Sequence, residues 1–177
     1  MSQANLLIRP AAEGDLDAVR AIYAHHVATS TGTFEITPPD RAEMARRKAE
    51  VAARGLPFLI AVADGAIAGY AYANLYRTRE AYRFTVEDSV YVAPDRLRQG
   101  VGNRLLARLI EDSAKAGARQ MVAVIGGSDN AGSIRLHERQ GFVRVGLLAA
   151  AGFKFGRWCD SVLMQRPLGE GDSTLPD

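Results

Sequence analysis

A short glycine-bearing loop between two predicted elements limits the possible folds of this chain more than any other segment. The loop contains Arg98-Gln99-Gly100-Val101-Gly102-Asn103. It follows an alternating, strand-like run at 84–92 and precedes an apolar helical pattern that ends near Gly117. A strand that leads into a helix through a glycine loop indicates a domain that mixes sheet and helix.

The same loop indicates an anion-binding site. A helix N-terminus carries unpaired backbone N–H groups and the positive end of the helix dipole. Gly100 and Gly102 let the backbone approach a bulky anion, and Arg96 and Arg98 add positive charge. The pattern therefore favours a cradle for a pyrophosphate group. A glycine turn that only starts a helix is the plain alternative.

Two common phosphate loops do not match this segment. No Gly-Lys-Ser/Thr ending follows the glycines, which excludes a nucleoside-triphosphate loop. The first turn of a dinucleotide fold requires a third glycine where this chain has Leu105.

The remaining segments predict one mixed α/β domain over residues 1–168. Two helices follow a first short strand, then come several strands and an alternation of strand and helix, which predicts a partly antiparallel sheet. Predicted strands are 6–8, 58–63, 67–75, 84–92, 121–125, 142–148 and 158–165. Predicted helices are 16–27, 40–55, 101–117 and 131–139. Residues 169–177 show no periodicity, and we expect disorder there.

The composition of the chain argues against several classes of protein. The 177 residues carry a net charge of only +2, which argues against binding to nucleic acid or to an anionic membrane surface. The single Cys159 predicts no internal disulfide, and the adjacent His25 and His26 with a lone His137 lack the spacing of a metal site. Met1–Arg9 lacks the pattern of a secretion signal, and no apolar run is long enough to span a membrane. We therefore expect a cytoplasmic protein.

Several side chains are candidates for chemistry. Glu87 lies in an otherwise apolar strand, so it is either an outward, solvated residue or an acid–base group. His137 is either a packed histidine or a second proton carrier. Arg77 and Arg79 lie in the loop before the Glu87 strand and could bind a carboxylate. Asp88 points to the opposite face of that strand and is read as structural.

Four segments together resemble a known enzyme family. Tyr91-Val92-Ala93-Pro94 followed by Arg98-Gln99-Gly100-Val101-Gly102 is similar to the acetyl-CoA motif of the GNAT (GCN5-related N-acetyltransferase) superfamily. The segments 85–92, 133–138 and 152–158 resemble its phosphinothricin and methionine sulfone/sulfoximine N-acetyltransferase branch. The resemblance covers about residues 8–168. It departs at Leu97, where the superfamily usually has Gln or Arg.

The resemblance implies a GNAT fold and a binding site for acetyl-CoA. The strand ending at Val90-Tyr91-Val92 would separate from its neighbour and pair with the pantetheine amides. The N–H of Val92 would stabilise an oxyanion at the thioester. The remaining implied cofactor-binding residues are Arg98, Gln99, Gly100, Val101, Gly102, Asn103 and Asn130, the last of which could equally be a helix N-cap.

The resemblance also implies catalytic and acceptor-binding residues. Glu87 would be the general base and would contact the acceptor, and His137 would take part in proton transfer. At least one of Arg77 and Arg79 would hold the acceptor's carboxylate, the alternative being ordinary solvated loop charge. Phe34 would be either a pocket wall or a core residue. The segment around Lys154, Phe155 and Trp158 would help to pair two subunits of a homodimer and would close the acceptor pocket. His25 and His26 are read as surface or loop packing, and Cys159 as a small core residue.

Two rival functions remain open from the sequence. The acceptor could be another amine, such as a polyamine, an aminoglycoside or a protein N-terminus. Alternatively, the domain could bind acyl-CoA without catalysis, and it would then tolerate Glu87→Gln. The arginine pair favours a small anionic amino-acid analogue.

Overall fold

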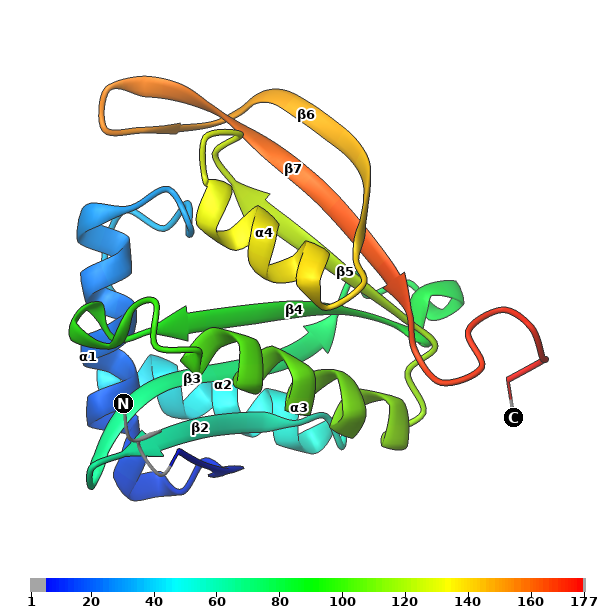
Figure 1. The fold of residues 1–177 in the computed structure, drawn as a ribbon, viewed down its shortest axis with the longest axis horizontal. Coiled ribbons are helices and arrows are strands. Elements are labelled where there is room, and N and C mark those ends of the chain that lie inside the picture. The colour runs from blue at the N-terminus through cyan, green and yellow to red at the C-terminus, as the bar shows by residue number, and fades with distance from the viewer. Residues whose placement is uncertain (1–5, 177) are drawn as a thin grey trace.

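The computed structural model describes residues 6–176 and contains one sheet with four helices (Figure 1). The prediction that Met1–Arg9 is no secretion signal rests partly on residues outside this range. The strands are β1 Leu7–Pro10, β2 Phe58–Ala63, β3 Ala66–Leu75, β4 Thr85–Val92, β5 Gln120–Gly126, β6 Val143–Lys154 and β7 Arg157–Pro167. The helices are α1 Leu16–Thr29, α2 Arg41–Ala53, α3 Val101–Lys115 and α4 Ala131–Arg139.

The sheet is mixed and mostly antiparallel, as predicted. Its strand order is β1-β2-β3-β4-β5-β7-β6, and only β4 and β5 run parallel. The β4–β5 pairing ends at Glu87 and Val122, although β4 continues to Val92 and β5 to Gly126. The two strands therefore separate beyond Glu87. We call this opening the β4–β5 gap.

Helices cover both faces of the sheet. The helix α3 packs its apolar face, including Leu105 and Leu109, on one side. On the other side, Val19 and Tyr23 of α1 and Met44 of α2 pack in a second core cluster. Figure 1 shows α3 and α4 on the same side of the molecule, with the β6–β7 hairpin extending above the rest of the sheet.

The sequence indicates an N-cap at Asp40 and a tight turn at Asp64-Gly65, and both are present in the structure. The sequence also indicates an N-cap at Asp15, but that carboxylate makes no capping hydrogen bond to α1 and pairs with Arg9. The Asp40 carboxylate accepts the backbone N–H of Glu43 at 2.8 Å and caps α2. Asp64 and Gly65 both have positive φ and form the tight β2–β3 turn. Gly117 after α3 has a φ of 91°, which glycine adopts without strain.

Two segments differ from the sequence expectation. The strand β6 extends to Lys154 instead of ending at Leu148, because the hairpin ladder resumes at Gly152 after an irregularity. Residues 169–176, within the segment expected to be disordered, form turns. There the Arg119 guanidinium contacts Glu170, Thr174 and Leu175.

Candidate active site

A deep cleft passes through the β4–β5 gap and has a volume of about 1030 Å³. It is lined by β4, the end of β5, the N-terminus of α3, one face of α4 and the loop 30–34. Because the strands separate there, the cleft reaches both faces of the sheet. One ligand could therefore enter on the α3–α4 face and another from the side of α1.

The predicted anion cradle forms one end of this cleft. Arg98, Gly100, Val101, Gly102 and Asn103 all line it at the start of α3. Gly100 has a φ of 82°, which favours glycine and lets the chain turn into the helix. The side chain of Gln99 is not among the lining residues, because its amide donates to the Asp95 carbonyl at 3.0 Å.

Gly102 lies in the cleft wall beside the cradle, where there is room for a Cβ in ordinary van der Waals contact. A Cβ at this position would lie 3.4 Å from both the Val92 and the Leu136 side chains. Leu97, where the chain departs from the superfamily pattern, lines the cleft and is exposed. Arg96 also lines it while pairing with Asp64 at 2.8 Å.

The free edge of β4 forms a second wall. Val90, Tyr91 and Val92 line the cleft, and no pairing with β5 extends this far along β4. The carbonyl of Val92 contacts Nε2 of His26 at 2.9 Å. Burial lowers the pKa of His26, opposed by this hydrogen bond, and the adjacent His25 lowers it further.

Glu87 lies where the β4–β5 gap begins. It is the last β4 residue paired with β5, and its side chain is half-buried in the cleft wall. Burial and the neighbouring Asp88 carboxylate raise the pKa of Glu87 to about 7, while Arg77 opposes them. A carboxyl that gains and loses a proton near neutral pH is suited to general acid–base chemistry.

Asp88 points to the opposite face of β4 and pairs with His137 of α4. Nε2 of His137 lies 2.9 Å from Oδ2 of Asp88, and Nδ1 lies 2.7 Å from the Ser133 carbonyl. Both side chains are buried. Burial alone would lower the pKa of His137, but the Asp88 charge and both hydrogen bonds raise it overall. Each ring nitrogen of His137 therefore faces an acceptor oxygen, an arrangement that favours the protonated imidazolium beside the cleft.

The loop 30–34 closes the cleft opposite Glu87. Thr31, Gly32, Thr33 and Phe34 all line it. Phe34 packs closely against Gly152 of β6, where a Cβ would come within 2.5 Å of the ring. Aromatic contact with a glycine fixes the ring position, so Phe34 forms part of the wall as the sequence suggested.

Arg77 and Arg79 do not form part of the cleft wall. Both are exposed, and neither is among the lining residues. The Arg77 guanidinium stacks on Tyr76, 4.3 Å from the ring centroid. Its charge nevertheless acts on Glu87, which places it near the cleft.

Asn130 caps α4, and the contact with the cofactor that the sequence left open stays a prediction. Its side chain caps α4 by accepting the N–H of Ser133 at 3.2 Å, and it also lines the cleft. The sequence reading missed His26, which it assigned to packing, and the pairing of Asp88 with His137. For His26, the only sequence indication is its position near the end of a helix that precedes a loop.

Two other kinds of site are not found within residues 6–176. No cluster of metal-ligating side chains occurs there, and no helix is long and apolar enough to cross a membrane. Cys159 is buried, as expected of a small core residue, and does not line the cleft.

Comparison with known proteins identifies relatives along nearly the whole chain. The model of the acetyltransferase (GNAT) family matches residues 19–142. A phosphinothricin N-acetyltransferase of Alcaligenes faecalis is 55% identical over 96% of this chain and 86% of that protein. An L-methionine sulfoximine/L-methionine sulfone acetyltransferase of Salmonella typhimurium is 38% identical over 93% of this chain and 96% of that protein.

One solved structure is similar to this chain in fold over nearly its whole length. It is a GNAT superfamily phosphinothricin acetyltransferase from Sinorhizobium meliloti in complex with AcCoA. Its TM-score is 0.94 at 45% identity, and the match covers 97% of this chain and 93% of that chain.

Proposed function

Because this chain belongs to the GNAT family of acetyltransferases, we propose that it transfers the acetyl group of acetyl-CoA to the α-amine of a small amino-acid analogue. The proposed acceptors are L-phosphinothricin, methionine sulfoximine, methionine sulfone or an arsenic counterpart. The names of the related enzymes support the first three of these acceptors. The observation that carries the proposal is Glu87, whose pKa is raised to about 7 where the β4–β5 gap opens.

The residues of the cleft fit acetyl-CoA in shape and charge. The N-terminus of α3, with Gly100 and Arg98, would hold the pyrophosphate. The unpaired edge of β4 would hydrogen-bond to the pantetheine amides, as an added strand does. The N–H of Val92 would donate to the acetyl carbonyl oxygen, and Asn130 at the start of α4 would contact the cofactor.

Glu87 and His137 divide the proton transfers between the two faces of β4. Acetyl-CoA supplies an activated acetyl thioester, which the acceptor amine attacks directly. An amine attacks only after losing its proton, and Glu87 accepts that proton directly or through one water. On the α4 face, His137 would donate a proton to the leaving thiolate, and exchange with water would then remove the proton from Glu87 and restore one to His137.

The acceptor would bind on the α1 side of the gap. Phe34 forms its apolar wall, and Glu87 faces its amine. Arg77 and Arg79 would pair with its carboxylate or its second anionic group. A cationic acceptor such as a polyamine or an aminoglycoside would be repelled by the same two side chains.

We further propose that the protein forms a homodimer through the β6–β7 hairpin. Exposed apolar side chains gather on this hairpin, including Val143, Leu147, Phe153 and Trp158. Such a patch is typical of a protein interface. Sedimentation analysis tests it, with Trp158→Asp expected to shift the protein to the monomer. The cytoplasmic location expected from the sequence remains a prediction.

The test of the reaction is a thiol-release assay with acetyl-CoA. L-phosphinothricin, methionine sulfone, spermidine and an aminoglycoside serve as acceptors for wild type and Glu87→Gln. The matched control is Glu111→Gln, which removes an exposed carboxylate of α3. We expect turnover of the amino-acid analogues that falls at least about a hundredfold only in Glu87→Gln.

Other outcomes separate the alternatives. Turnover of the cationic amines alone would retain the enzyme class and overturn the anionic acceptor. Binding of acetyl-CoA without turnover of any acceptor, equal in wild type and Glu87→Gln, would favour a non-catalytic binding module.

A further inference from the structure

The tip of the β6–β7 hairpin reaches the loop 30–34 across the cleft. The hairpin ladder is interrupted between Leu148 and Gly152, and Ala150 has a φ of 51°. The ladder then resumes with Gly152 opposite Cys159 and Lys154 opposite Arg157. This irregularity lets the tip leave the plane of the sheet and lie against the loop, with Phe34 packed on Gly152.

Lys154 extends from this tip into the loop. Only 4% of the residue is exposed, which is unusual for a lysine. Its Nζ donates to the Ser30 carbonyl at 2.8 Å and to the Thr33 carbonyl at 2.7 Å. These two carbonyls bracket Thr31 and Gly32, so the ammonium fixes the conformation of a segment that lines the cleft.

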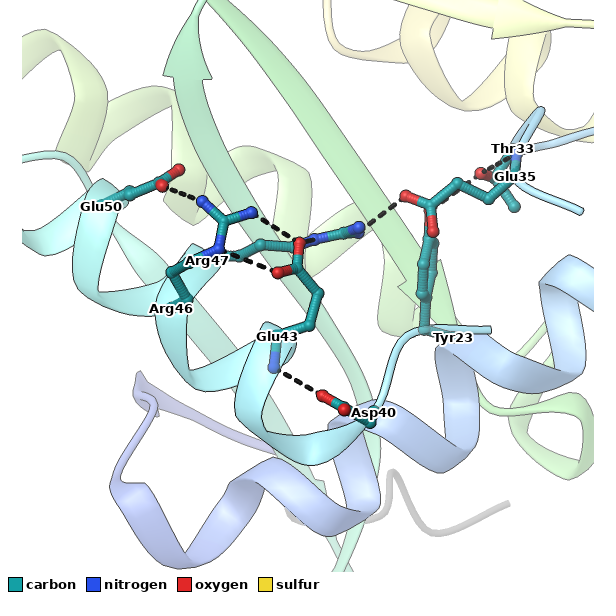
Figure 2. Close-up of polar contacts among 8 residues, drawn as sticks. All are labelled: Tyr23, Thr33, Glu35, Asp40, Glu43, Arg46, Arg47 and Glu50. Atoms are coloured by element: carbon teal, nitrogen blue, oxygen red, sulfur yellow. Dashed lines mark hydrogen bonds and ion pairs between the residues drawn. The ribbon is translucent and has the colours of Figure 1, made fainter. Parts of the chain in front are cut away.

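The loop is also held from its other side, by α1, α2 and the end of β5. Figure 2 shows the Arg47 guanidinium reaching from α2 to the Glu35 carboxylate, at 2.7 Å. Oη of Tyr23 in α1 contacts Oγ1 of Thr33 at 2.8 Å. Thr31 donates from Oγ1 to the Gly126 carbonyl at 3.2 Å. The loop therefore lies between these contacts and the Lys154 ammonium.

The two sets of contacts attach the loop to different parts of the molecule. Arg47 and Tyr23 attach the loop to α2 and α1, which pack against the sheet in the second core cluster. Lys154 attaches it to the hairpin that also seats Phe34. Without the ammonium, the Ser30 and Thr33 carbonyls would lose their donor, and the loop would no longer be held against Gly152.

We propose that Lys154 is a positioning residue for the acceptor: it holds the loop 30–34 so that Phe34 and Thr31 form the acceptor wall. This inference rests on the function proposed above. Lys154 lines no part of the large cleft itself, so it acts through the loop. Its loss weakens acceptor binding and leaves the binding of acetyl-CoA, at α3 and β4, unchanged.

The test uses three variants of the full chain with L-phosphinothricin as acceptor. Lys154→Met keeps the length and apolar stem but removes the donors, and Lys154→Arg keeps a charged donor. Arg157→Met is the matched control, because it removes an exposed cation from the opposite position of the same hairpin. We expect the acceptor KM to rise about tenfold or more in Lys154→Met.

The expected pattern is specific to positioning. The KM for acetyl-CoA stays within about twofold of wild type, Lys154→Arg recovers part of the acceptor KM, and Arg157→Met resembles wild type. An acceptor KM in Lys154→Met equal to that of Arg157→Met would overturn the inference. Equal changes in both KM values would do the same, because they indicate a general structural defect.

Hydrogen exchange separates this inference from the proposed function. Backbone amides of residues 29–36 should exchange about tenfold faster in Lys154→Met than in wild type or Arg157→Met. If wild type turns over no acceptor, the proposed function fails, but faster exchange in Lys154→Met still supports the role of Lys154 in holding the loop 30–34. If exchange is the same in wild type, Lys154→Met and Arg157→Met, the inference about Lys154 is overturned whether or not the acceptor is turned over.

Discussion

Replacing Glu87 by Gln should make the protein more stable at alkaline pH while it removes the proposed base. Burial and the Asp88 charge raise the pKa of Glu87 from its ordinary value of 4.5 to about 7. The folded protein therefore keeps the proton between these two values, whereas the unfolded chain releases it. Stability consequently falls as pH rises through this window and stays lower above it. A glutamine has no proton to lose and avoids this cost.

The size of the effect follows from the same pKa values. A change from 4.5 to about 7, at about 1.4 kcal/mol per pH unit, corresponds to an upper limit of about 3 kcal/mol. Glu87 faces an open cleft, where water screens the charge, so we expect about 2 kcal/mol. For a domain of this size that is a difference in Tm of roughly 4–8 °C.

The assay is urea unfolding of wild type, Glu87→Gln and Glu111→Gln at pH 5.0 and pH 8.5. The stability of Glu87→Gln relative to wild type should increase by about 2 kcal/mol between the two pH values. The exposed Glu111→Gln should show no such change. A Glu87→Gln difference that is the same at both pH values would refute the argument, because it would mean that the carboxyl has an ordinary pKa.

Three further substitutions test other parts of the site. Asp88→Asn removes the charge that raises the pKa of His137, while the burial that lowers this pKa remains. An NMR titration of the variant should therefore give His137 a pKa below its ordinary value of 6.5. Gly126→Ala places a Cβ 1.9 Å from the Thr31 carbonyl oxygen, which should displace the loop 30–34. The variant should have a higher acceptor KM and should be about 1–3 kcal/mol less stable in urea unfolding. Arg98→Ala should weaken CoA binding about tenfold in calorimetry and reduce its salt dependence, and an unchanged affinity would contradict a phosphate contact.

Much of the fold could be predicted because its determinants are local. The bounds of α4, 131–139, and the Asp64-Gly65 turn were predicted correctly from caps, glycines and apolar spacing. The full length of β6 was not. Most of that strand is exposed, so no alternation of buried and exposed side chains marks its extension to Lys154. The ladder also resumes only after an irregularity that no local pattern indicates.

The candidate site likewise contains one part that depends on neighbouring residues and several contacts between residues that are far apart in the sequence. The phosphate cradle lies within six consecutive residues, and its conformation depends on glycines and on a helix start. The other contacts join distant positions. His26 contacts Val92 across 66 positions, Asp88 meets His137 across 49, and Lys154 reaches Ser30 across 124. No spacing rule relates residues so far apart, so sequence reasoning missed these contacts.

The amino-acid sequence alone was enough to indicate the class of domain, the glycine cradle and the strand that carries Glu87. Backbone conformation and helix starts depend on neighbours within a few residues, and a single sequence records them. The cleft itself depends on where two strands stop pairing, and the state of Glu87 depends on what packs around it. Burial and charge at that point are properties of the assembled chain, because they arise from residues brought together by folding.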